Sequence, residues 1–226
     1  MSFFLFLILP TFGQEEREAS EDSKPIIEIT TFGIKSDVDA GAFAKRDSQV
    51  EADFTAKQSG FIKRQSGVSE EGDYVVMVYW KSLPDAEASI KKFMGDASVA
   101  DYAQMIDGPT MKMARFTTDV PFSADKPKFV EVMSFDLVQN TDLKEFSELN
   151  KSVETDFTSK REGFLQRLTA SNEEGKQAVV VYWESKETSD ASLQPFMAAP
   201  ISKQFMSKMD QSSISMGRYS LLKAEE

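Results

Sequence analysis

The chain repeats itself at a distance of 103 residues, and this repeat limits its possible folds more than any other feature of the sequence. Asp53-Phe-Thr-Ala-Lys57 returns as Asp156-Phe-Thr-Ser-Lys160. The same spacing relates three more matches, which are Gly60-Phe61 with Gly163-Phe164, Tyr79-Trp80 with Tyr182-Trp183, and Phe93-Met94 with Phe196-Met197. The match runs without a gap from about residues 26–118 onto 129–221. The chain therefore contains an internal duplication of two units, each large enough to be a small domain.

The duplication and the segments around it divide the chain into five parts. Residues 1–13 form an apolar run, Phe3 to Pro10, followed by Thr11-Phe12-Gly13, which is typical of a signal peptide although no basic residue precedes the run. Residues 14–24 are charged and predict a flexible leader. The repeats are expected at 25–119 and 128–222, and the linker between them at 120–127 contains two prolines. We therefore expect a secreted or periplasmic protein.

The composition excludes most familiar catalytic machinery. The sequence has no histidine and no cysteine, which removes the commonest general base, the commonest metal ligands, thiol nucleophiles and disulfides. Lys and Arg total 26 against 37 Asp and Glu, giving a net charge of −11. Such an acidic protein is not expected to bind nucleic acid, because phosphate binding depends on clustered cations. No motif indicates a metal cluster, a phosphate loop or a catalytic triad.

Each repeat predicts the order strand, helix, strand, strand, helix, strand. In the first repeat we expect a helix capped by Asp37 that ends at Gly60, and a second helix over residues 86–107. Asn140 and Asp142 are expected to serve as caps in the second repeat, where Pro200 predicts a broken second helix. The strands are expected at residues 26–34, 61–66, 74–82 and 110–117, and in the second repeat at 164–169, 177–185 and 213–220, with a first strand that begins near Phe129.

This order is that of a ferredoxin-like unit, an α+β fold with both helices on one face of a four-stranded antiparallel sheet. The strand Val75-Val-Met-Val-Tyr-Trp80 is apolar on both faces, so the face without helices must also be covered. The second repeat supplies an identical sheet to cover it. The two repeats are therefore expected to pack sheet to sheet as an α/β barrel within one chain, and the protein to be a monomer.

Three features of each repeat resemble the dimeric α/β-barrel superfamily. They are the Gly-Phe after the first helix, the Tyr-Trp-x-Ser at the third strand, and the small and acidic residues that open the second helix. Within it, the chain is most similar to the antibiotic biosynthesis monooxygenase (ABM) group, as a fused tandem of two units over residues 26–221. The resemblance implies either a cofactor-independent monooxygenase or a relative of the haem-degrading or chlorite-dismutase-like proteins. Members often carry a histidine in the second helix, where this chain has Lys91-Lys-Phe-Met94 and Gln194-Pro-Phe-Met197. We therefore expect no haem and no other cofactor.

The candidate ligand site is the slot between the first helix and the sheet of each repeat. Asp47 lies on the same helical stripe as Phe43, Val50 and Phe54, and Asn150 lies on the matching stripe of Phe146, Val153 and Phe157. Asp47 is the candidate catalytic base, and Asn150 can only exchange hydrogen bonds. Alternatively, both are polar residues at the edge of a helix that is otherwise packed into the core.

Two further sets of residues are candidates, each with a structural alternative. Trp80 and Trp183 are expected to line the substrate pocket, or to be core residues, because adjacent strand residues point to opposite faces of the sheet. Two pairs of opposite charges lie on strands that are neighbours in this fold, Glu28 with Arg115 and Glu131 with Arg218. The second strand of each repeat also carries an arginine, Arg64 or Arg167. These charges could form ion pairs inside the barrel or ordinary surface salt bridges.

Two classes of function fit these observations. The first is a cofactor-independent monooxygenase that acts on a small aromatic or polycyclic substrate, for which the protein supplies a dry pocket and orientation. The second is a non-catalytic domain that binds a small apolar ligand or another protein. The partner expected in either case is a small apolar or aromatic molecule, with no membrane association after removal of the signal peptide.

Overall fold

The first half of the described chain has the predicted order of strands and helices. The computed structural model describes residues 24–222, so the predicted signal peptide and nearly all of the predicted leader lie outside the described residues. The helices and strands of the first half are β1 (Ile26–Phe32), α1 (Ala40–Asp53), β2 (Phe61–Val68), β3 (Tyr74–Trp80), α2 (Leu83–Phe93), α3 (Ala100–Met105) and β4 (Lys112–Thr117).

The second half repeats this order. Its elements are β5 (Phe129–Phe135), α4 (Leu143–Asp156), β6 (Phe164–Ser171), β7 (Gln177–Trp183), α5 (Lys186–Ala198), α6 (Pro200–Ser207) and β8 (Ser215–Leu221). The break between α5 and α6 confirms the interruption predicted from Pro200, which is the first residue of α6. Proline suits that position because the first helical N–H has no partner within the helix.

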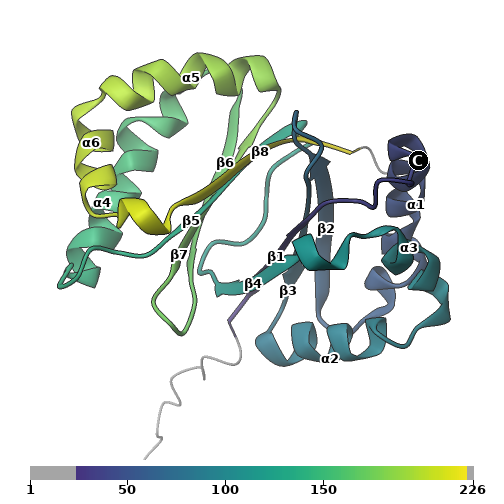
Figure 1. Ribbon diagram of the computed structural model, residues 1–226. Helices are drawn as coiled ribbons and strands as arrows, with labels where there is room; N and C mark the ends of the chain where they lie inside the picture. The colour runs from purple at the N-terminus through teal and green to yellow at the C-terminus, as the bar shows by residue number, and fades with distance from the viewer. Residues whose placement is uncertain (1–23, 223–226) are drawn as a thin grey trace, which may run out of the picture.

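The eight strands form one closed antiparallel barrel. Its order is β1-β3-β2-β8-β5-β7-β6-β4, so each half contributes a four-stranded ferredoxin-like sheet and the barrel closes at two seams. The β2–β8 seam pairs Gly67 with Leu221 and Val68 with Ser220, and the β4–β6 seam pairs only Thr117 with Ser171. The helices of the two halves lie on opposite outer sides of the barrel (Figure 1). The predicted α+β fold, two ferredoxin-like repeats packed as an intramolecular barrel, is confirmed.

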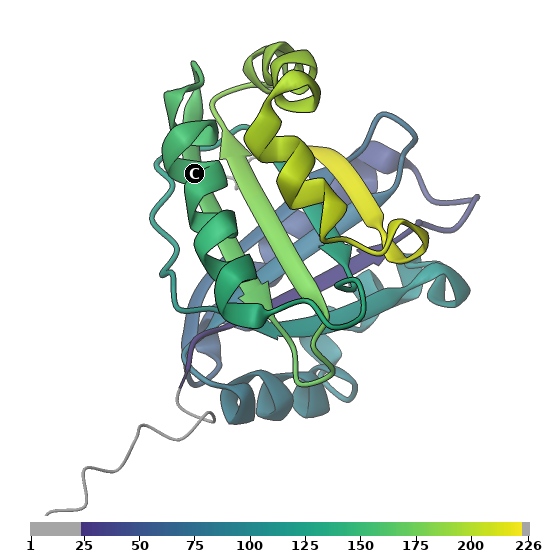
Figure 2. The same cartoon turned by 90° about the vertical axis from the view of Figure 1, so that its left-hand side faces the viewer.

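Alternation along the strands separates two kinds of core. In β3, the side chains of Val75, Met77 and Tyr79 lie in the barrel interior, and Val76, Val78 and Trp80 pack on the helix side. All seven residues of β3 are buried, as the apolar pattern on both faces predicts. Figure 2 shows the helix layer of the second half, where α4 and α6 lie over the strands of that half. Each half therefore has its own core between the sheet and the helices, and both share the barrel interior.

The interior of the barrel is filled at its centre by tyrosines and by the linker. The hydroxyls of Tyr79 and Tyr182 form a hydrogen bond with each other. Phe122 of the linker packs against both rings, with centroid separations of 5.0 and 5.4 Å. The buried Gln166 accepts hydrogen bonds from the backbone N–H groups of Ser123 and Ala124. The linker is thus part of the core and not only a connection.

Three details of the helices differ from the prediction. The N-cap of α1 is Asp39 and not Asp37, since the Asp39 carboxylate accepts from the N–H of Ala42. The helix ends at Asp53 and is followed by a 3₁₀ turn, so Gly60 has the expected positive φ of 70° but is not the C-cap. The second helix of the first half is divided into α2 and α3 by a bend near Asp96, whose carboxylate accepts from the N–H of Ser98.

Candidate functional site

Each half of the barrel has one apolar pocket between its sheet and its helices. The first pocket has a volume of about 210 Å³ and the second about 250 Å³. Most of their wall residues are related in pairs through the 103-residue repeat. The first is lined by Val50, Phe54, Val76, Val78, Trp80 and Phe93, among others, and the second by Phe157, Val179, Val181, Trp183 and Phe196, among others. These volumes are slightly below the roughly 300–1,000 Å³ of common ligand pockets, so an occupant would be small.

Each pocket wall contains a buried tryptophan whose indole N–H has no partner. Trp80 and Trp183 end strands β3 and β7, and their exposed fractions are 1% and 2%. Within the described residues, neither Nε1 atom makes a hydrogen bond. A buried donor without an acceptor costs free energy, so this pair of orphaned groups is unusual. An acceptor atom on a bound molecule would satisfy them.

Each pocket also contains a glutamate that is paired with an arginine on the neighbouring strand. Arg115 Nε donates to Glu28 Oε2 at 2.6 Å, and Arg218 Nε donates to Glu131 Oε1 at 3.2 Å. These pairs lie on the helix side of the sheet and not in the barrel interior, because Glu28 alternates with Ile27 and Ile29 of the interior core. Burial raises the pKa of Glu28 and outweighs the charge and hydrogen bond of Arg115, which lower it.

Asp47 lies at the centre of a buried polar network. Its carboxylate accepts hydrogen bonds from Arg64 at 2.5 and 3.2 Å, from the Tyr102 hydroxyl at 2.9 Å and from the Ser66 hydroxyl. Burial raises the pKa of Asp47, but the charge and hydrogen bonds of Arg64 and the two hydroxyls outweigh burial, so that the pKa lies below its ordinary value. The result is a satisfied, firmly ionised carboxylate.

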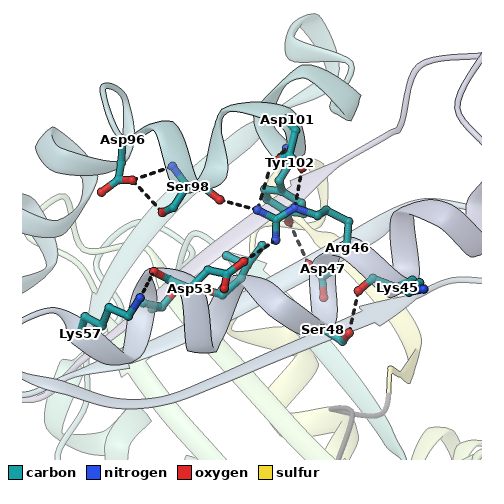
Figure 3. Close-up of polar contacts among 12 residues, drawn as sticks. Lys45, Arg46, Asp47, Ser48, Asp53, Lys57, Asp96, Ser98, Asp101 and Tyr102 are labelled. Atoms are coloured by element: carbon teal, nitrogen blue, oxygen red, sulfur yellow. Dashed lines mark hydrogen bonds and ion pairs between the residues drawn. The ribbon is translucent and has the colours of Figure 1, made fainter.

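Another arginine, Arg46 on α1, holds α3 in place, and α3 carries Tyr102. Arg46 donates to Asp101 at 2.8 and 3.0 Å and to Asp53 at 3.0 Å, and it also donates to the backbone carbonyl of Ser98 (Figure 3). The close-up shows Asp47 on the same helix with its contact to Tyr102. Together, Arg46 and Asp47 join α1 to α3, whose Tyr102 lines the first pocket.

The corresponding network in the second half lacks a carboxylate. Asn150 occupies the place of Asp47, and its side-chain oxygen accepts from Arg167 Nη2 at 2.5 Å. Phe205 occupies the place of Tyr102, and the Arg167 guanidinium lies 5.5 Å from the centre of its ring. Arg167 is 3% exposed. Burial lowers its pKa to about 10, against a weaker opposing effect of Glu154, so the side chain is still cationic at neutral pH.

The structure places the predicted site residues in two groups. Val50, Phe54, Trp80, Phe157 and Trp183 line the pockets. The others are buried in the helix-side cores without lining a pocket. These are Phe43, Phe146 and Val153 together with the polar residues Asp47 and Asn150.

Asp47, the candidate catalytic base, and its counterpart Asn150 therefore do not line these two pockets. The carboxylates that line the pockets are Glu28 and Glu131, and the cations that line them are Arg64 and Arg167. The sequence held a sign of these four charged residues. They lie on β1, β2, β5 and β6, and side chains alternate between the two faces of a strand, so each can be placed on the same face as apolar residues of the helix-side core. Two members of the stripe on α1, Val50 and Phe54, line the first pocket, and the charged residues of its wall come from the strands.

The barrel is shared with several solved structures. Comparison with protein-family models finds no match, and no curated protein matches the sequence. A protein of Fusobacterium nucleatum, provisionally assigned as a monooxygenase, matches with a TM-score of 0.65 at 15% identity, over 89% of this chain and 94% of its own. A similarly assigned protein of Lactobacillus acidophilus gives 0.64 at 13% identity, over 88% and 95%. An anthrone oxidase-like protein gives 0.63 at 12% identity, over 91% and 96%.

These matches establish the fold, which is that of the dimeric α/β-barrel superfamily with both units in one chain. Chlorite dismutases of Candidatus Nitrospira defluvii share it with TM-scores of up to 0.58. The coverage of nearly nine tenths of this chain shows that the likeness extends over both repeats. All the identities are low, so the matches define a monooxygenase-like fold and no particular reaction.

The pockets do not fit a haem group, which the resemblance made one of the alternatives. The tyrosine that lines the first pocket, Tyr102, directs its hydroxyl to Asp47, and the volumes of about 210 and 250 Å³ are small for a porphyrin. Among residues 24–222, no group of three or more acidic side chains is placed to hold a metal ion. Over the same residues, no helix is long and apolar enough to cross a bilayer.

Proposed function

We propose that the protein binds a small, flat, mainly apolar molecule in the pockets between the sheet and the helices, and that it oxygenates this molecule. The observation that carries the proposal is the pair of matched pockets, each with an apolar wall and a buried tryptophan N–H that has no acceptor. A molecule with an aromatic body and one carbonyl or hydroxyl oxygen fits both features. The monooxygenase-like fold supports the oxygenase part of the proposal.

Glu28 is the group best placed to start such a reaction in the first pocket. It lines the pocket, it is 8% exposed, and its raised pKa makes it a stronger base than an ordinary carboxylate. In the proposed reaction, Glu28 removes a proton from an activated C–H bond of the substrate. The resulting carbanion transfers electrons to O₂, and a C–O bond forms. Asp47 is excluded from this role by its pairing with Arg64 and by its lowered pKa.

Anthrone is a suitable probe, because one structural neighbour is anthrone oxidase-like. With one O₂, the CH₂ group of anthrone becomes a second ketone, one oxygen atom stays in the product and the other leaves as water. We expect O₂ uptake with anthrone, and a loss of about a hundredfold or more in kcat on Glu28→Gln, as is usual for a general base. Glu87→Gln, an exposed carboxylate on α2, is the matched control and should leave the rate unchanged.

Binding without turnover is the second candidate. The observation in its favour is the short ion pair of Glu28 with Arg115, at 2.6 Å, because the positive charge of Arg115 lowers the pKa of Glu28 and so opposes the uptake of a proton. Native mass spectrometry of the purified chain separates the two candidates. An unchanged small molecule that co-purifies, together with anthrone oxidation no faster than in buffer, would reject the oxygenase and leave the binding protein.

A further inference from the structure

The two pockets have similar walls but differ in how the arginine of the wall is paired. Two ion pairs lie at the first pocket, Glu28 with Arg115 and Asp47 with Arg64, so both charges in its wall, Glu28 and Arg64, have a partner of opposite charge. In the second, Arg218 is paired with Glu131 at 3.2 Å and with the partly exposed Asp190 at 2.7 Å. Arg167 is left with the neutral Asn150. Within the described residues, the second pocket therefore has in its wall an arginine without an ion-pair partner, whereas the arginine in the wall of the first is paired.

Arg167 has no carboxylate partner within the described residues. The salt bridges found there include none to Arg167, and Glu154, whose charge raises the Arg167 pKa, acts from beyond the 4.0 Å of an ion pair. Two of its five N–H donors are used, by the side-chain oxygen of Asn150 at 2.5 Å and by its backbone carbonyl at 3.1 Å. A buried cation with so few partners is costly unless a negative charge joins it.

The place where such a charge can enter is the pocket itself. Arg167 lines it together with Phe157, Trp183, Phe196 and Phe205. The apolar wall selects against inorganic phosphate or sulfate, whose charge would lie against hydrocarbon on most sides. It selects for a molecule that has one anionic end and a small apolar body.

We propose that the second pocket binds small apolar carboxylic acids, with the carboxylate on Arg167 and the apolar body against Trp183. This inference rests on the proposed function, since it names the ligand class of one of the same two pockets. A carboxylate matches the planar guanidinium and its remaining donors. The first pocket is lined by Arg64, which Asp47 already pairs from behind the wall, so this pocket prefers the neutral form of the same molecule.

The two tryptophans allow each pocket to be observed alone. The chain contains only two, one per pocket. In Trp80→Phe, fluorescence reports on Trp183 and the second pocket, and in Trp183→Phe it reports on Trp80 and the first. The probes are 2-naphthoate and its neutral counterpart 2-naphthamide, which have nearly the same shape. Their absorption near the tryptophan emission allows binding to be followed by energy transfer.

We expect the Trp80→Phe protein to bind 2-naphthoate about tenfold or more tightly than 2-naphthamide, the range for a hydrogen bond to a charged group. Asn150→Asp gives Arg167 an internal partner and should remove this preference. The converse variant, Asp47→Asn in the Trp183→Phe protein, should create a preference for 2-naphthoate in the first pocket. Melting curves identify variants that do not fold, and the two exchanges test the idea independently.

The outcomes separate this inference from the proposal that it deepens. Equal affinity for the two probes, or a preference that survives Asn150→Asp, would overturn the role of Arg167 and leave the pockets as binding sites. No energy transfer with either probe in either pocket would overturn both the inference and the proposed binding function. Preference for 2-naphthoate that is lost in Asn150→Asp supports both.

Discussion

At the scale of single residues, Asp47 was predicted to be a catalytic base, and the structure shows it in a buried ion pair. It lies on the predicted helix, but the partners that determine its chemistry come from β2 and α3, 17 to 55 residues away in the sequence. A spacing pattern on one helix cannot show them. Asp47 and Arg64, 1% and 7% exposed, instead form a buried pair whose members depend on each other.

Replacing Asp47 should therefore destabilise the protein. We expect Asp47→Asn to lower the free energy of unfolding by about 3 kcal/mol, because it leaves the Arg64 cation buried without a counter-charge. Chemical denaturation followed by tryptophan fluorescence measures the change. Asp53→Asn on the same helix, whose carboxylate is half exposed, is the control and should cost less than about 1 kcal/mol. Equal effects of the two substitutions would contradict the buried pair.

The same carboxylate should make stability depend on acidity in a defined direction. The pKa of Asp47 is lower in the folded protein than the value of about 3.9 in an unfolded chain. Its contribution is therefore complete above about pH 5 and is lost as the pH falls below 4 toward the folded pKa. The stability difference between the wild type and Asp47→Asn should shrink in that range. A difference that stays constant down to pH 3 would show that Asp47 does not titrate as we infer.

The reciprocal substitution in the second half, Asn150→Asp, should stabilise the protein. Asn150→Asp supplies Arg167 with a carboxylate at a hydrogen bond that already measures 2.5 Å. We expect the free energy of unfolding at pH 7 to rise by about 1–3 kcal/mol, the usual gain of a charge-assisted hydrogen bond. Thermal unfolding in the absence of ligand is the measurement. A lower melting temperature would mean that Phe205 and the surrounding apolar groups reject the added charge.

At the scale of helices and strands, the seams of the barrel depend on a few close contacts. At Gly67, on the β2–β8 seam, an added Cβ would lie 2.9 Å from the Cβ of Tyr219 and 3.0 Å from the carbonyl of Ser220. Both neighbours are held by the sheet, so the strands themselves would have to separate.

Gly67→Ala should therefore weaken the seam. We expect a loss of about 1–3 kcal/mol of unfolding free energy, which is the usual cost of an overpacked contact. Gly95→Ala is the matched control, because an added Cβ at Gly95 meets no atom within 4 Å, and it should change stability by less than about 0.5 kcal/mol. Hydrogen exchange of β8 amides would locate the effect. Protection lost elsewhere but not in β8 would argue against the seam as the site of damage.

The order of the elements was predictable from the sequence, and their ends only in part. The apolar residues along the strands and the 103-residue repeat identified all eight strands, because a strand predicted in one half has its counterpart in the other. The bend between α2 and α3 was missed because the competing cap, Asp96, is one polar residue in a helical pattern. Glu28 and Arg167 were visible as charges on strands, but their position in a pocket depends on which strand face the helices cover.

At the scale of the molecule, each half depends on the other to cover its sheet. The face that carries Val75, Met77 and Tyr79 in the first half packs against Val130, Val180 and Tyr182 of the second. A chain of residues 24–119 alone would expose this face. We expect it to self-associate or aggregate, whereas the full chain is expected to sediment as a monomer. A soluble, folded monomer of one half, seen by sedimentation velocity, would contradict the dependence.

The covalent fusion of the two halves has a consequence for how such a site can evolve. In a barrel assembled from two identical subunits, one gene specifies both pockets, and any substitution appears twice, with its benefit and its damage doubled. Here each pocket is specified separately. Asp47 could become asparagine in one copy, as at position 150, while the other copy kept the ion pair that secures folding. The two pockets can therefore differ although one gene specifies both. The second pocket can acquire a new specificity while the ion pair in the first half keeps the chain folded.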